Sequence, residues 1–230
     1  MKNAAVIAIL ATFLFCSAAG AYPVSVGDTI YITSSGPLGG GGEIAVVNQT
    51  NGFRFESFCL EREEIVLQGS DNPYVVYNLS SYAMSGGGGA VDGRDELSGG
   101  TKWLYYNYWT GVLASEYGYN GVGSKKGQGA VQLAIWYMEG ETDGLVEKDG
   151  GGKKWDGRYF YELAMQHEKE GALLPVYAMN IWGPYRQGAE VGEGQSMLVV
   201  TPEPWTLILL GTGLIGLVAI RRKSSPHSTN

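Results

Sequence analysis

The stretch EIAVVNQTNGFRFESFCL, residues 43–60, decides which kind of fold to expect. Apolar residues alternate with polar ones over 53–58, and residues 43–48 are rich in β-branched side chains, so both segments are predicted to be strands. Asn51-Gly52 between them is the strongest short signal for a tight hairpin turn. One face of the second strand is predicted to carry Phe53, Phe55 and Ser57, and the other Arg54, Glu56 and Phe58. The stretch therefore predicts a β-hairpin with one buried face.

Further strands and a helical section surround this hairpin. Strands are expected at 24–33, 65–67, 74–77, 173–181 and 196–200. Helices are expected after Thr101, which follows Gly99-Gly100 as a capping residue, over 128–139, and after Asp156. The order of strands, helices and strands predicts an α+β fold, a β-rich, sandwich-like domain with an inserted helical section.

Composition narrows the class of protein. The 230 residues include 36 glycines, 12% are aromatic and only 17% are charged, which favours a turn-rich surface protein over a cytosolic helical enzyme. The formal net charge of -7 argues against a nucleic-acid partner. No glycine-rich segment has the lysine of a phosphate-binding loop, so these segments are interpreted as linkers.

The first 21 residues have the pattern of a secretory signal peptide. Lys2 gives a positive start, residues 4–16 are apolar, and Ala19-Gly20-Ala21 is a cleavage site of small residues. Removing residues 1–21 also removes Cys16, which leaves Cys59 as the one cysteine of the mature chain. Cys59 is then a buried inert thiol, an intermolecular partner or a reactive group.

The C-terminal stretch TPEPWTLILLGTGLIGLVAIRRK, residues 201–223, has three consecutive parts. Pro202-Glu203-Pro204 is a rigid extended step. Residues 205–220 are apolar apart from threonine and glycine, and as a helix they span about 24 Å, slightly less than a bilayer core of about 30 Å. Arg221, Arg222 and Lys223 close the segment with positive charge, which predicts a single membrane helix with a cytoplasmic basic end.

These three parts resemble a PEP-CTERM sorting signal, the C-terminal tail of exported proteins in Gram-negative bacteria that make exopolysaccharide. The resemblance implies processing by an exosortase-type membrane protease and delivery to the cell surface or the extracellular matrix, with transient anchoring in the membrane. It divides the chain into a signal peptide at 1–21, an extracellular body at 22–200, the sorting signal at 201–223 and a polar tail at 224–230.

Two further motifs in the body resemble the halves of a bacterial thioester domain, which surface adhesins contain. They are Phe58-Cys59-Leu60 and Gln132-Leu133-Ala134-Ile135-Trp136. The resemblance implies an internal thioester between Cys59 and Gln132, open to attack by a surface amine or a polysaccharide hydroxyl. It also implies a dry supporting shell, formed by Phe58, Leu60, Ala134, Ile135 and Trp136. Such a group reacts once, so the chain is expected to be a crosslinking protein without enzymatic turnover.

Other candidate residues point to weaker alternatives. Tyr108 and Trp109, in an aromatic run, are expected either to pack in the core or to contact a glycan. Glu61, Glu63 and Glu64 are expected to lie on a solvated face. The body has the single histidine His167, so neither a metal site nor a cofactor or catalytic residue is predicted. The alternative to thioester adhesion is a non-reactive structural or glycan-binding matrix protein, and a secreted hydrolase is a third class.

Overall fold

We describe the chain from a computed structural model, which defines residues 22–36, 40–64, 66–84, 91–121, 127–148, 152, 154–183, 194–201 and 211. The predicted signal peptide and the polar tail lie outside these ranges, as does the predicted sorting signal except for Thr201 and Gly211. Among the described residues no helix is long and apolar enough to cross a membrane. The membrane helix at 205–220 therefore stays a prediction.

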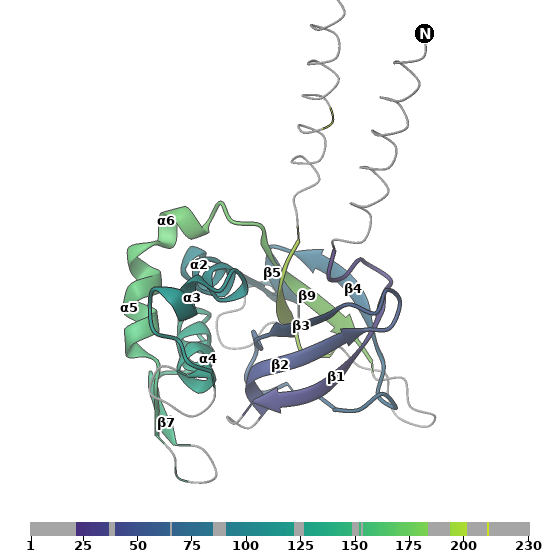
Figure 1. Ribbon diagram of the computed structural model, residues 1–230, viewed down its shortest axis with the longest axis horizontal. Helices are drawn as coiled ribbons and strands as arrows, with labels where there is room; N and C mark the ends of the chain where they lie inside the picture. The colour runs from purple at the N-terminus through teal and green to yellow at the C-terminus, as the bar shows by residue number, and fades with distance from the viewer. Residues whose placement is uncertain are drawn as a thin grey trace, which may run out of the picture.

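A six-stranded antiparallel sheet forms one half of the body (Figure 1). Its strands are β1 (Thr29–Gly36), β2 (Gly40–Asn48), β3 (Arg54–Ser57), β4 (Tyr74–Ser80), β9 (Val176–Trp182) and β10 (Met197–Val200), in the spatial order β10-β9-β4-β1-β2-β3. The turn predicted at Asn51-Gly52 joins β2 to β3, with Val47 opposite Arg54. Gly52 has a φ of 77°, a conformation that glycine adopts without steric cost.

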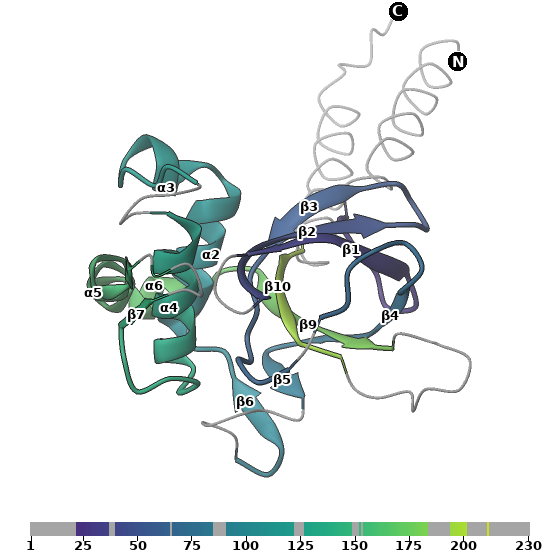
Figure 2. The ribbon, with the colours of Figure 1, turned by 90° about the horizontal axis from the view of Figure 1, so that it is seen from below.

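The two edges of this sheet meet, so the sheet closes into a barrel (Figure 2). Beyond β3 the chain continues beside β10, where the Leu60 N–H donates to the Ser196 carbonyl at 2.9 Å and the Leu198 N–H donates to the Phe58 carbonyl at 3.1 Å. Cys59 pairs with Met197 between these two bonds. The predicted sandwich-like body is thus a single curled sheet, in which β3 and β10 protect each other's edges.

The helical section is inserted between β4 and β9 and gathers on one side of the barrel (Figure 1). It contains α2 (Gly99–Trp109), α3 (Val112–Ser115), α4 (Gln128–Met138), α5 (Arg158–Gln166) and α6 (Glu168–Gly171). Two small hairpins accompany it, β5 (Tyr82–Met84) with β6 (Arg94–Glu96) and β7 (Val146–Lys148) with β8 (Lys154–Asp156). The predicted α+β class, β-rich with an inserted helical section, is confirmed.

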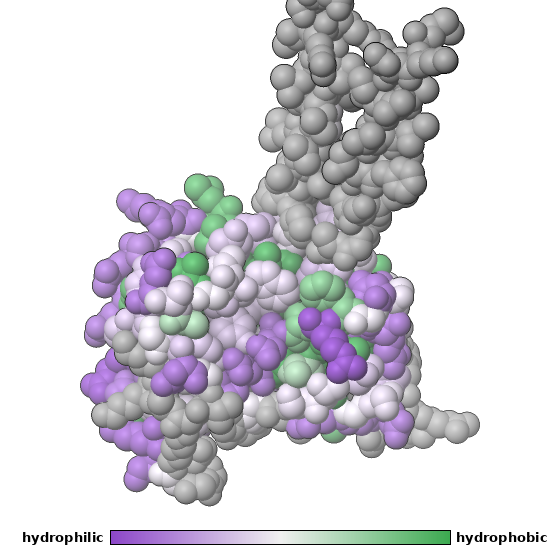
Figure 3. Space-filling view, in the orientation of Figure 1, coloured by the Kyte–Doolittle hydropathy of each residue, from purple (hydrophilic) through white to green (hydrophobic). Residues whose placement is uncertain are grey.

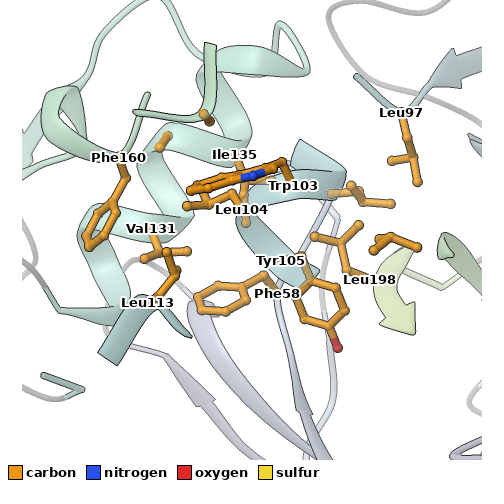
Figure 4. Close-up of a cluster of buried hydrophobic side chains, with 14 of the residues drawn as sticks. Phe58, Leu97, Trp103, Leu104, Tyr105, Leu113, Val131, Ile135, Phe160 and Leu198 are labelled. Atoms are coloured by element: carbon orange, nitrogen blue, oxygen red, sulfur yellow. The ribbon is translucent and has the colours of Figure 1, made fainter. Parts of the chain in front are cut away.

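Two buried clusters hold these parts together. One combines the inward side chains of all six barrel strands and includes Ile30, Val76, Met179 and Cys59. The other lies between the barrel and the helices, where Phe58 meets Tyr105 and Val131 (Figure 4). Because side chains alternate along an extended segment, Cys59 faces the barrel cluster while its neighbours Phe58 and Leu60 face the helices.

Three local predictions were wrong. Ser98, rather than Thr101, caps α2, because its hydroxyl accepts the Thr101 N–H at 3.1 Å. Gly99 and Gly100 belong to the helix itself, where their lack of a side chain allows α6 to approach closely. Residues 66 and 67 form no strand, since the Leu67 N–H bonds to the Tyr74 hydroxyl at 2.8 Å; Ile65 lies outside the described residues. Gly157, rather than Asp156, directly precedes α5, and Asp156 ends β8, although its carboxylate accepts the Arg158 N–H at 3.2 Å.

Candidate functional site

The sheet splits at the point where Cys59 lies. β2 and β3 pair as far as Ile44 opposite Ser57, and the same register would place Gly42 opposite Cys59. The chain after Ser57 instead pairs with β10 to close the barrel. Backbone groups of Gly42 and Cys59 are therefore left facing a gap between two diverging strands.

The carboxamide of Gln132 fills this gap. Its Oε1 accepts the Gly42 N–H at 2.9 Å and the Cys59 N–H at 3.1 Å. Its Nε2 donates to the Cys59 carbonyl at 2.8 Å. Gln132 and Cys59 are 0% and 1% exposed, so the side chain replaces a strand partner for buried backbone groups that would otherwise lose their hydrogen bonds.

Helix α4 positions this carboxamide against β2. One turn before Gln132, the Gln128 Oε1 accepts the Glu43 N–H at 3.1 Å, so two glutamines of one helix face bind consecutive residues of the strand. Ala130, Val131 and Ala134 are fully buried around them. The helix therefore cannot shift along the strand without breaking both sets of bonds.

The two residues predicted to form a thioester are thus adjacent, although 73 positions separate them in the sequence. The carbonyl oxygen of Gln132 faces two backbone N–H groups, the arrangement that stabilises a tetrahedral oxyanion in acyl transfer. The expected shell is also buried: Phe58, Ala134 and Ile135 are 0% exposed, and Leu60 and Trp136 are 2% exposed. The site therefore excludes water. A thioester persists only where water is excluded, because water hydrolyses it.

Two carboxyl groups, those of Glu61 and Glu64, lie near the Cys59 thiol, which the sequence did not indicate. Glu61 was expected on a solvated face but is 2% exposed, and its Oε2 accepts the Ser196 N–H at 2.9 Å. Burial beside Glu64 raises the pKa of Glu61 well above its ordinary value. Burial, with a smaller effect of Glu61 and Glu64, likewise raises the pKa of the Cys59 thiol. Glu63 is exposed as expected, whereas Glu64 is half-buried.

A second site lies along the β2–β3 hairpin, where α2 and α3 approach the barrel. It is a hollow of about 340 Å³, lined by Glu43, Phe53, Arg54, Phe55, Glu56, Tyr108, Trp109, Ala114 and Tyr119. Tyr108 and Trp109, the predicted glycan contacts, are half-buried side by side in its wall. Glu43 and Glu56 were not predicted to be site residues, although the register of the hairpin places both on its outer face.

His167 packs against other side chains of the helical section. Its ring stacks on Trp103 with the centroids 4.3 Å apart, and its Nδ1 lies 2.9 Å from a Glu170 carboxylate oxygen. In the part of the chain that the structure describes, no group of histidine, cysteine and carboxylate side chains could hold a metal ion.

Comparison with known families bears on the C-terminal stretch. Residues 200–223 match the PEP-CTERM protein-sorting motif. The chain carries an exosortase sorting signal. The PEP-CTERM signal implies export and exosortase-dependent sorting to the cell surface or matrix, as predicted from Pro202-Glu203-Pro204 and the basic cluster. No curated protein and no solved structure matches the chain, so the function of the body is argued from its own geometry.

Proposed function

We propose that the body forms an internal thioester between Cys59 and Gln132 and uses it to attach the exported protein covalently to a partner. The observation that carries the proposal is that the Gln132 carboxamide binds the backbone of Cys59 while both residues are buried. The host is a Gram-negative bacterium, and the protein acts on the cell surface or in the exopolysaccharide matrix. The sorting signal supports this location, and the net charge of -7 suits a partner other than nucleic acid.

Formation of the thioester follows from this contact. The Cys59 sulfur attacks the Gln132 side-chain carbon, the carbon–nitrogen bond breaks, and ammonia leaves with the proton of the thiol. Throughout, the Gly42 and Cys59 N–H groups hold the oxygen on which negative charge develops. The bonds of the Gln132 carboxamide to the Cys59 backbone hold it beside the cysteine, which supplies the effective concentration that a free thiol and amide lack.

The thioester is then the electrophile for a partner. An amine attacks the Gln132 carbon and forms an amide, the carbon–sulfur bond breaks, and the amine's proton goes to the Cys59 sulfur. A hydroxyl would form an ester in the same way. Because burial disfavours the thiolate, Cys59 is a poor leaving group until the site opens, which protects the bond before use. The reaction consumes the site, so the protein is a crosslinker without turnover.

The mass of the full chain, purified in detergent and kept away from strong nucleophiles, tests this proposal. The expected mass is lower by one ammonia than that of the unmodified chain, and treatment with methylamine should add one methylamine at Gln132. Cys59→Ser should show neither change, whereas Gln166→Asn, which alters an exposed glutamine at the end of α5, should behave as the wild type. An unmodified mass with a thiol that reacts only after unfolding would contradict the proposal.

A second candidate is a non-reactive structural or glycan-binding matrix protein of the same fold. The hollow beside Tyr108 and Trp109 favours it, since aromatic side chains in an open site suit sugar rings. Its test is binding of matrix polysaccharide by Cys59→Ser and by Trp109→Ala. Glycan binding predicts that the first variant binds and the second does not.

A further inference from the structure

The hollow between the β2–β3 hairpin and α2 has an unusual supply of hydrogen-bonding groups. The Tyr108 hydroxyl lies 2.9 Å from Glu43 Oε1 and 2.5 Å from Glu56 Oε2, and the Tyr119 hydroxyl also donates to Glu43. Burial and the neighbouring carboxylates raise the pKa of both phenols, which therefore remain protonated. Their protons are already donated to the two glutamates, so the groups left for a ligand are mainly carboxylate lone pairs.

The lining of the hollow also carries more negative than positive charge. Glu43 and Glu56 give two negative charges, and Arg54 on the exposed rim is the one basic residue of the lining. The ion pairs among the described residues are Arg62–Glu147 and Arg158–Asp156, and His167 contacts Glu170, so none of these pairs includes Glu43 or Glu56. A ligand that fits must bring positive charge and hydrogen-bond donors.

Aromatic side chains form the remaining wall. Phe55 lies between Phe53 and Trp109, with ring centroids 6.4 Å and 6.1 Å away. Figure 3 shows hydrophobic residues gathered on the face over β2 and β3, beside strongly hydrophilic ones. Aromatic rings attract a cation over their faces and also cover an alkyl chain. The wall therefore suits a cation that carries a hydrocarbon stem.

We propose that this hollow binds the primary ammonium group of a lysine side chain on a partner protein, through the remaining lone pairs of the Glu43 and Glu56 carboxylates and against the ring of Trp109. An ammonium has three donors and no acceptor, which matches the acceptor-rich hollow, whereas sugar hydroxyls need both kinds of partner. Phe58, whose ring centroid lies 4.9 Å from that of Tyr108, connects the wall to Cys59. Glu43 also directly follows Gly42, whose N–H binds Gln132.

This inference gives the proposed thioester its substrate class, and it rests on the proposed function only for the covalent step. Docking of a lysine beside the electrophile favours amide formation over attack by a polysaccharide hydroxyl. Reversible binding itself needs no thioester, so the two proposals can fail separately.

Calorimetry on the full-length Cys59→Ser chain in detergent tests the docking step. The ligands are Nα-acetyl-lysine-N-methylamide and its norleucine counterpart, which lacks the amine. We expect the lysine compound alone to bind, and Glu43→Gln/Glu56→Gln to weaken it at least tenfold while keeping acceptors for the tyrosines. Glu116→Gln, an exposed carboxylate outside the hollow, should leave binding unchanged. Equal binding of both compounds, no binding, or preference for a neutral disaccharide would overturn the proposal.

Labelling of chains that retain Cys59 separates the two proposals. Methylamine, too small to span the hollow, should label the wild type and the double glutamine variant equally fast, whereas the lysine compound should label the variant at least tenfold more slowly. Labelling by both amines without this difference would refute the docking site and leave the thioester standing. Binding of the lysine compound without any labelling would refute the thioester and leave the docking site standing.

Discussion

The Gln132 side chain supplies hydrogen bonds that a neighbouring strand would otherwise make. Its carboxamide binds the backbone of both Gly42 and Cys59 where β2 and the chain after β3 diverge. The same three bonds aim the side-chain carbon toward the cysteine segment. The local structure and the proposed chemistry thus depend on the same side chain. A hydrophobic residue of similar size could neither make these hydrogen bonds nor form a thioester.

Replacing Gln132 by leucine should therefore lower the free energy of unfolding even without a thioester. Three buried backbone groups lose their partner, at about 1–3 kcal/mol each before relaxation, so we expect a loss of about 3–5 kcal/mol. Urea denaturation in the Cys59→Ser background measures it without the covalent bond. Gln128→Leu, which removes one bond to Glu43, should cost only about 1 kcal/mol. Equal costs for the two would show that the gap is closed by other contacts.

Glu139 provides a second test at the scale of one residue. Its Oε1 accepts the Ser98 hydroxyl proton at 2.7 Å, and burial raises its pKa from 4.5 to about 7. A carboxyl group with a raised pKa binds more protons in the folded state, so its contribution to stability is lost as pH rises from about 4.5 through 7. Between pH 4.5 and pH 8, the free energy of unfolding of the wild type should therefore fall by about 3 kcal/mol relative to that of Glu139→Gln.

Urea denaturation at pH 4.5 and pH 8 measures the Glu139 effect. Glutamine keeps the acceptor for Ser98 but does not ionise, so the difference between the variant and the wild type isolates this one group. Gln166→Asn, on the exposed side of α5, removes no ionisable group and should differ from the wild type by the same amount at both pH values. A Glu139→Gln difference that does not change with pH would contradict the assignment.

At the scale of elements, the contact between α2 and α6 depends on two facing glycines. A Cβ on Gly171 would lie 1.8 Å from the Gly99 carbonyl oxygen, so Gly171→Ala must push the two helices apart. We expect a loss of about 3 kcal/mol or more in the free energy of unfolding, measured by urea denaturation. At Gly144, where the nearest atom is 4.0 Å away, alanine should change stability by less than about 0.5 kcal/mol. A small effect at Gly171 would mean that α6 moves freely.

Some elements of the fold could be predicted from the sequence and others could not. The β2–β3 hairpin was predictable because its turn and its alternation are local, and α4 because its apolar residues repeat at helical spacing. The split beside Cys59 was not, since it depends on β10 arriving from almost 140 residues later to pair with Phe58 and Leu60. The cap of α2 was misassigned because Ser98 and Thr101 are both good caps, and only the packing of Gly99 against α6 selects between them.

The candidate site was predictable in its residue types but not in its geometry. The cysteine and glutamine motifs pointed to Cys59 and Gln132, but only the fold shows that Gln132 reaches the Cys59 backbone. Burial of Glu61 could not be foreseen, because a run of glutamates ordinarily faces solvent and only the closing β10 segment supplies the Ser196 N–H. Glu43 and Glu56 likewise acquire meaning only when α2 brings Tyr108 between them.

At the scale of the whole molecule, the strand that closes the barrel leads directly into the sorting signal. The Thr201 N–H donates to the Pro175 carbonyl at 3.1 Å, and Thr201 is 9% exposed, so it belongs to the packed body. Pro202 follows at once and lacks the N–H that another ladder bond would need. The sorting signal therefore begins next to the strand that pairs with the Cys59 segment.

Sorting and folding should consequently be separable at this junction. Replacing Pro202, Glu203 and Pro204 by alanine leaves the bonds of Thr201 and β10 in place, so the melting temperature of the body should change little. The unprocessed chain should nevertheless accumulate in the membrane fraction, because the exosortase signal has lost its first part. Mass spectrometry of fractionated cells measures both forms, with Pro226→Ala in the polar tail as the matched control. Normal processing of the triple variant would show that the apolar segment and the basic cluster are sufficient for sorting.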